Sequence, residues 1–214
     1  MLAYKFTGPG GASVFTGFQW PLPVDGAPGE WVRISDGVDL CVAGIHACRP
    51  DQVPHWLGPE LWRIELDGDV VESAHKLVAP AGRLVARVEG WPRAERDFAE
   101  DCAARVRQLA AGELLAAGFH EDAASTAAAQ SVDELGAIAE SVAHRAPPLV
   151  AQLVGYAVDC YWDIDNSYFA MCAYVAATAF ASDATGDTVQ DMSSLGWAEE
   201  RARQAAWLAT RLAL

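Results

Sequence analysis

Two groups of side chains in this sequence have the residue types and spacing that acid–base chemistry requires. The first contains His46, which follows a glycine at the end of an expected strand and whose imidazole titrates near neutral pH. Cys48, two residues later, falls on the same face of an extended chain. A His/Cys pair of this kind is suited to proton transfer or thiolate chemistry. The alternative is that His46 hydrogen-bonds to a backbone carbonyl and fixes the loop.

The second group belongs to one expected helix and the turn after it. Asp159 and Asp163 are one helical turn apart, so their carboxylates share a helix face. Neighbouring carboxylates raise each other's pKa and can supply an acid and a base. Tyr161, Trp162 and Tyr168 add aromatic rings with polar groups, which are typical of small-molecule pockets. The alternative is that the acidic residues cap helix ends and face solvent.

Other motifs predict neither a metal ion nor a cofactor. The sequence has no C-x-x-C pair, no Glu-x-x-His pattern and no histidines at metal-ligand spacing. Gly8-x-Gly-Gly11 follows a strand but precedes no helix, so a phosphate-binding loop is not expected. Trp20 is one of four tryptophans in the first 62 residues. We expect its side chain either in the core or, alternatively, in the wall of a substrate cleft.

Charge and composition exclude several classes of protein. The 214 residues include 15 Lys and Arg against 29 Asp and Glu, a formal charge of −14, so nucleic-acid binding is not expected. No apolar run is long enough to cross a membrane, and no secretory signal is present. Five cysteines, an odd number at irregular spacing, indicate reduced and mostly buried thiols. These features predict a cytoplasmic protein without nucleic-acid or membrane partners.

The elements that must position these residues fall into two parts, because the composition changes at Trp91-Pro92. Residues 1–92 contain most of the Pro and Gly and several short alternating segments, which predict a β-rich domain. The expected strands are 3–7, 13–20 (or an extended loop), 31–35, 39–48, 61–66, 70–71, 76–78 and 82–88, with a helical turn or two at 50–57.

Residues 93–214 are rich in alanine and predict a helical bundle. The expected helices are 94–117, 120–145 as one or two helices, 149–163, a helix starting at 166 or 167 and ending at 180, and one from 193 or 194 to 212. Ser131-x-x-Glu134 has the pattern of a capping box, and Pro147-Pro148 breaks the chain before the third of these.

Several blocks of this sequence resemble those of an uncharacterised actinobacterial protein family. These blocks are Tyr4-Lys-Phe6, Phe15-Thr-Gly-Phe-Gln-Trp-Pro21, Gly44-Ile-His-Ala-Cys48, Glu60-Leu-Trp-Arg-Ile-Glu-Leu-Asp-Gly68, Gly82-Arg-Leu-Val85 and the closing helix 200–212. The resemblance covers nearly the whole chain. It implies an architecture, but the family has no assigned activity.

A fold-level analogy links residues 44–67 to ADP-ribosyltransferase-like domains. There, a glycine–hydrophobic–histidine block, a short helix and a strand ending in acidic residues follow one another, as they do here. This chain departs from that pattern, because its first strand has no Arg or His and neither a Ser-Thr-Ser strand nor a Glu-x-Glu motif follows. The analogy concerns the fold and does not by itself imply the activity.

Together these features predict an α+β protein, in which a small twisted sheet domain (1–92) packs on a bundle of about five helices (93–214). We expect a pocket at their junction and a small-molecule ligand, with no prediction of oligomeric state. One hypothesis is a cofactor-independent lyase, isomerase or cyclase, in which His46 is the acid–base group and Asp163 its charged counterpart. Substrate contacts would come from Cys48, Trp20, Asp159, Tyr161, Trp162 and Tyr168. The alternative is a non-catalytic binding or accessory protein, or a degenerate ADP-ribosyltransferase-like domain.

Overall fold

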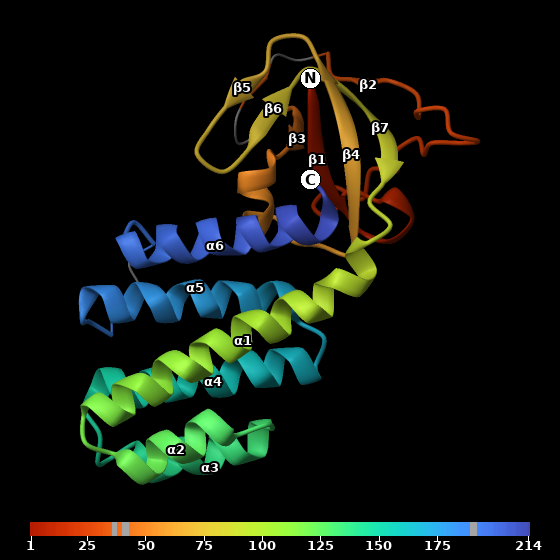
Figure 1. Cartoon of the computed structure of the whole chain (residues 1–214). Helices are drawn as coiled ribbons and strands as arrows, with labels where there is room; N and C mark the ends of the chain where they lie inside the picture. Colours follow the sequence, from red (N-terminus) through yellow and green to blue (C-terminus); the bar gives the residue numbers. More distant parts are fainter. Residues whose placement is uncertain (36–37, 40–42, 189–191) are drawn as a thin grey trace. The chain divides into compact units, whose positions relative to one another are not determined.

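The computed structural model describes residues 1–35, 38–39, 43–188 and 192–214 (Figure 1). Strands come first and helices follow, which confirms the α+β class. The chain divides into two compact units: a sheet unit, Met1–Ala94 with Ala205–Leu214, and a helical unit, Glu95–Gln204. The composition change at Trp91-Pro92 therefore lies close to the first division. Composition gave no sign that the last ten residues belong with the sheet unit.

The sheet unit contains two antiparallel sheets, with strand orders β1-β4-β7-β2 and β3-β6-β5. Its strands are β1 (Leu2–Thr7), β2 (Val32–Arg33), β3 (Ile45–Ala47), β4 (Glu60–Asp67), β5 (Val71–Glu72), β6 (Leu77–Ala79) and β7 (Ala81–Arg87). Its described residues also include two short 3-10 helices, η1 (Pro9–Gly11) and η2 (Pro50–His55).

The two sheets are joined at two places and enclose a common core. Pro80 alone separates β6 from β7, so one chain segment passes from one sheet to the other. Tyr4 and Cys48 exchange backbone hydrogen bonds of 2.8 Å, which pair β1 with the end of β3. The core residues between them are Ala3, Trp20, Ile45, Ala47, Trp62, Ile64, Leu66, Leu77, Ala79 and Leu84. Trp20 therefore lies in the core.

Most of the expected strands are confirmed, and the exceptions have local causes. Residues 13–20 form neither the strand nor the extended loop that the sequence predicts: residues 14–16 form a turn, and one isolated bridge joins Ala12 to Gln19. The strand expected at 39–48 is shorter in the structure, where it is β3. An isolated bridge between Asp39 and Ala43 precedes it. Residues 40–42, including Cys41, lie outside the described residues. Gly44, at φ +142°, separates that bridge from the strand.

The helical part of the chain contains six α-helices among the described residues. They are α1 (Trp91–Ala116), α2 (His120–Ala128), α3 (Val132–Val142), α4 (Pro148–Asp165), α5 (Phe169–Thr185) and α6 (Leu195–Leu212). The 120–145 segment thus forms two helices, and Ser131 caps the second by accepting a 3.2 Å hydrogen bond from the Glu134 N–H. Ser194 similarly accepts a hydrogen bond from the Trp197 N–H at the start of α6.

Small residues let the helices of the helical unit approach closely. The buried residues of α5 are mostly alanines, and α5 packs against α4 while α4 also packs against α3. A Cβ at Gly196 would lie 2.2 Å from the carbonyl oxygen of Phe180, so only glycine fits at that contact between α6 and α5. The alanine-rich composition is therefore explained by helix packing as well as by helix propensity.

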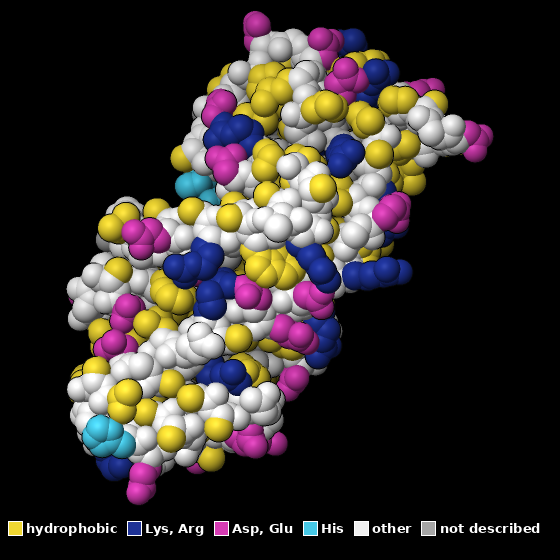
Figure 2. Space-filling model, in the orientation of Figure 1, with side chains coloured by type: hydrophobic (Ala, Val, Ile, Leu, Met, Phe, Trp, Pro, Cys, Tyr) yellow, Lys and Arg dark blue, Asp and Glu magenta, His cyan; other side chains and the backbone are white. Residues whose placement is uncertain are grey.

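No helix among the described residues has both the length and the apolar character needed to cross a bilayer. Acidic side chains are distributed over the face shown in Figure 2 rather than gathered at one place. This distribution accords with the formal charge of −14 and with a solvated surface.

Candidate functional site

The C-terminal half of α4 positions three of the predicted site residues on one helix face. Asp159, Trp162 and Asp163 are spaced i, i+3 and i+4, which places them next to one another. Asp159 and the Trp162 side chain are exposed, whereas Asp163 is only 4% exposed. We call Asp159, Trp162, Asp163 and Tyr168 the acidic–aromatic cluster.

Asp163 is the unusual member of this cluster because one oxygen of its carboxyl group is buried without a partner in the described part of the chain. Its Oδ2 atom has no hydrogen-bond partner in the described part of the chain. Burial, together with the nearby charge of Asp159, raises the pKa of Asp163 to about 6. Burial also raises the pKa of Asp159. The predicted effect of one carboxylate on the other is thus present only at Asp163, where burial is the larger cause; for Asp159 burial is the cause of the shift.

The turn between α4 and α5 brings Tyr168 next to Trp162. The Tyr168 N–H donates a 2.7 Å hydrogen bond to the Asp163 carbonyl, and the Asn166 side chain donates to the Trp162 carbonyl at 2.8 Å. The Trp162 and Tyr168 rings lie 5.7 Å apart at a tilt of 32°, and the residues are 49% and 55% exposed. Asn166 therefore ends α4 instead of capping the next helix.

Tyr161 lies on a different side of α4 and has a different partner. Two residues along a helix turn it by about 200°, so its side chain points away from that of Asp163. Its hydroxyl accepts a 2.8 Å hydrogen bond from the guanidinium of Arg107 on α1, which also donates to the carbonyl of Ala129. Burial raises the pKa of Tyr161, and Arg107 opposes that shift. Tyr161 joins α4 to α1 and is not part of the cluster.

His46 and Cys48 lie in the sheet unit, at β3 and just after it. The Nε2 atom of His46 is buried and has no partner within the described ranges. Burial and the positive charges of Lys76 and Lys5 lower the pKa of His46, so its imidazole is neutral at pH 7. Cys48 is 1% exposed, its thiol donates to the Tyr4 carbonyl at 3.4 Å, and burial raises its pKa to about 12. This thiol is therefore not a thiolate at neutral pH.

Lys5 is a residue that the sequence argument missed. It lies on the inner face of β1, and its ammonium donates a 2.9 Å hydrogen bond to the His46 carbonyl while lying 5.1 Å from the centre of the Trp20 ring. Burial lowers the pKa of Lys5 to about 8. The one available signal was the alternation of β1, which places Lys5 on the same face as the core residue Ala3.

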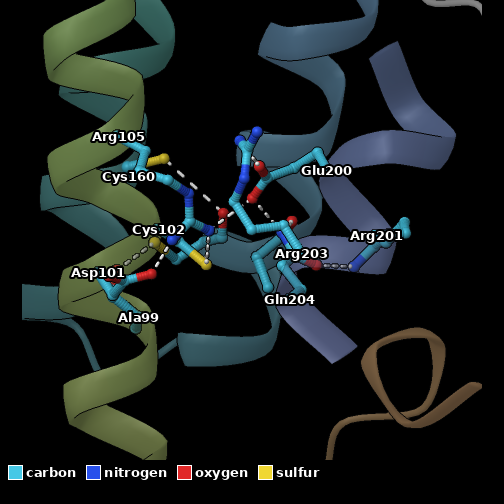
Figure 3. A network of polar contacts seen from close by, with 11 residues as sticks. Ala99, Asp101, Cys102, Arg105, Cys160, Glu200, Arg201, Arg203 and Gln204 are labelled. Atoms are coloured by element: carbon cyan, nitrogen blue, oxygen red, sulfur yellow. Dashed lines mark hydrogen bonds and ion pairs between the residues drawn. The ribbon is translucent and has the colours of Figure 1, made fainter. Parts of the chain in front are cut away.

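A second group that sequence reasoning missed is a buried ionic network in the helical unit, centred on Glu200 (Figure 3). The Glu200 side chain is 0% exposed and accepts hydrogen bonds from Arg105 (2.6 Å), Gln204 (3.0 Å) and Arg203 (3.1 Å). Gln204 also donates to the Ala173 carbonyl at 2.9 Å. The network joins α1, α5 and α6 and satisfies Glu200 completely, which indicates a structural role.

The glycine loop after β1 is occupied by a side chain of the protein itself. The backbone N–H groups of Gly10 and Gly11 donate to the Glu60 carboxylate at 3.2 and 3.0 Å, and the Trp62 indole donates to it at 3.3 Å. Burial acts to raise the pKa of Glu60, but these donors and Arg87 outweigh it and hold the pKa below its usual value. The loop therefore binds an internal carboxylate, in agreement with the expectation that it is no phosphate site.

The predicted site residues thus fall into two groups, one in each unit. His46, Cys48 and Trp20 belong to the sheet unit, and Asp159, Tyr161, Trp162, Asp163 and Tyr168 to the helical unit. The pairing of His46 with Asp163 stays a prediction. Within the residues that the structure describes, no three His, Cys, Asp or Glu side chains are placed to hold a metal ion.

Comparison with models of known protein families, with curated proteins and with solved structures gives no match to this chain. The resemblance to an actinobacterial family and the analogy to ADP-ribosyltransferase-like domains therefore stay predictions.

Proposed function

We propose that this protein binds a small organic cation, an amine or a quaternary ammonium ion, at the acidic–aromatic cluster of α4. The observation that carries the proposal is the buried carboxyl group of Asp163, whose Oδ2 has no partner among the described residues. Buried polar groups in folded proteins are nearly always hydrogen-bonded, so an orphaned carboxyl points to a use other than stability.

The groups around Asp163 favour a cation over other ligands. Asp159 contributes an exposed carboxyl group one helical turn away. Trp162 and Tyr168 present two adjoining, half-exposed rings, and aromatic faces attract organic cations through their quadrupoles. Carboxylates and aromatic rings side by side are the combination that recognises alkylammonium groups. The formal charge of −14 also favours the approach of cations.

The raised pKa of Asp163 makes binding depend on pH. Near pH 6 this group changes between its neutral and anionic forms. A cation binds more tightly to the cluster when Asp163 is ionised, so affinity rises as the pH passes upward through about 6. By linkage, the bound cation lowers the pKa of Asp163 in turn.

The hypothesis of a cofactor-independent enzyme stays open as a separate prediction. It requires His46 and Asp163 to act on one substrate. The binding hypothesis requires only residues that one helix and its following turn bring together. For that reason the geometry favours the non-catalytic small-molecule-binding alternative.

The test is a titration with benzyltrimethylammonium at pH 7, measured by isothermal calorimetry. Trp162→Ala should weaken binding about fivefold, which corresponds to about 1 kcal/mol of cation–π interaction. Asp159→Asn should weaken it similarly. Glu140→Gln is the matched control, because it removes one negative charge from an exposed position on another helix, α3. Absence of binding at millimolar ligand, or equal affinities in all four proteins, would refute the proposal.

A further inference from the structure

Burial disfavours the charged form of Lys5, although a backbone carbonyl and a tryptophan ring lie next to its nitrogen. Its side chain leaves β1 on the inner face of the sheet unit, next to Trp20, which is 6% exposed. Across the described residues its nitrogen has one hydrogen-bond acceptor, the His46 carbonyl at 2.9 Å. The nearest titratable groups are the neutral thiol of Cys48 and the neutral imidazole of His46. Among the residues that the structure describes, no carboxylate forms an ion pair with Lys5.

The ring beside this amine carries a hydrogen-bond donor without an acceptor. The indole Nε1 of Trp20 is buried and has no partner in the part of the chain that the structure describes. The ring centre lies 5.1 Å from the Lys5 nitrogen. The amine and the unpartnered N–H thus belong to adjoining side chains, and a carbonyl compound has a group for each: its carbon accepts an amine lone pair and its oxygen accepts an N–H.

We propose that Lys5 is a reactive amine that condenses with small aldehydes to form an imine within the sheet unit. The lone pair of Nζ forms a bond to the carbonyl carbon, and the C=O π electrons move to the oxygen, which takes one amine proton. The carbinolamine then loses its hydroxyl group with the second amine proton as water, which leaves the C=N bond. One amine and one aldehyde thus give one imine and one water, and no oxidant or cofactor is required.

The size of the expected effect follows from the fraction of neutral amine. With a pKa of about 8, roughly one tenth of Lys5 is neutral at pH 7. A solvated lysine of pKa about 10.4 is neutral to well under one part in a thousand. Partial burial of Lys5 slows the approach of the aldehyde and offsets part of this advantage. We expect a net difference of at least about tenfold in rate.

The chain offers an internal control, because Lys5 and Lys76 are its only two lysines. The folded full-length protein is treated with acetaldehyde and cyanoborohydride at pH 7, and peptide mass spectrometry measures reductive ethylation at each lysine and at the terminal amine. Lys5 should react at least about tenfold faster than Lys76, with a pH profile that levels off above about 8. In urea the two rates should become equal.

Three variants sharpen the test. Lys5→Arg should abolish the fast reaction, and Lys76→Arg should retain it. Trp20→Phe keeps the ring but removes the orphan N–H, so Lys5 should react several-fold more slowly with an unchanged pH midpoint. The proposal is overturned if wild-type Lys76 reacts as fast as Lys5, or if the Lys5 rate still rises steeply beyond pH 9. Because the decisive comparison uses the wild-type chain, it does not depend on the folding of any variant.

Discussion

Replacing Asp163 with asparagine should change how the stability of the protein depends on pH. Asparagine has nearly the shape of a protonated aspartate but cannot ionise. In the wild-type protein the folded state holds the Asp163 proton up to pH about 6, whereas the unfolded state loses it near the usual value of 3.8. Between these values the folded state binds more protons than the unfolded state, so stability falls as pH rises.

The magnitude follows from the displacement of the pKa. A difference between 3.8 and about 6 corresponds to about 3 kcal/mol of stability, fully present below pH 3.8 and fully lost above pH 6. About 2 kcal/mol of this loss falls between pH 4 and pH 7. Asp163→Asn should therefore gain about 2 kcal/mol relative to wild type over that range. For a chain of this size, that corresponds to a relative shift in melting temperature of about 4–8 °C.

The assay is urea unfolding followed by circular dichroism at pH 4, 5, 6 and 7, for wild type, Asp163→Asn and the exposed control Asp165→Asn. The informative quantity is the difference between variant and wild type, because contributions of other carboxylates cancel in it. Any constant cost of burying the asparagine amide remains in that difference but cancels in its change from pH 4 to pH 7. A difference for Asp163→Asn that stays flat from pH 4 to pH 7, or that matches Asp165→Asn, would refute the reasoning.

Three further substitutions test the structural framework at pH 7, each by its melting temperature. Ser131→Ala removes the cap from α3, bonded to the Glu134 N–H, and should lower stability by about 1 kcal/mol, or about 2–4 °C. Glu60→Gln replaces a carboxylate bound by backbone N–H groups and should lose about 1.5–3 kcal/mol at pH 7. Because the pKa of Glu60 is lowered, this stability is present above its usual titration range, and the loss should diminish as the pH falls through the folded-state pKa. Glu200→Ala removes the acceptor of the Arg105, Arg203 and Gln204 hydrogen bonds, while Arg105 keeps its ion pair with Asp101, and should lose about 1.5–3 kcal/mol, whereas the exposed Glu199→Ala should change little.

Much of the secondary structure was predictable because its signals are local. The alternation in residues 61–66 and 82–88 predicted β4 and β7. Ser131, three residues before Glu134, predicted the start of α3. The arrangement of strands in two sheets was not predictable in this way. It depends on the corner at Pro80 and on the bridge between Tyr4 and Cys48, which are 44 residues apart. Such a contact leaves no periodic trace in either segment.

The same distinction explains what was found and missed in the candidate site. The Asp159–Asp163 pair follows from helical spacing alone, and the structure places both on α4 as expected. The same helical spacing places Tyr161 on a different face of α4. Its position in the helix, considered before its residue type, would have excluded it from the predicted site. The burial of Lys5 had one local sign, the alternation of β1, but the groups that bury it are Trp20 and a strand about 40 residues away.

The two proposals share a physical basis and can nevertheless fail separately. In both, burial disfavours the ionised form of a titratable group that has no ion-pair partner among the described residues. Burial raises the pKa of Asp163, which favours the neutral acid, and lowers the pKa of Lys5, which favours the neutral amine. If the burial of these groups had no functional role, each group would destabilise the folded state and bind no ligand. Ligand binding distinguishes these cases, since a cation should lower the pKa of Asp163 and an aldehyde should capture the Lys5 amine. The groups belong to different units, so a negative result for one leaves the other intact.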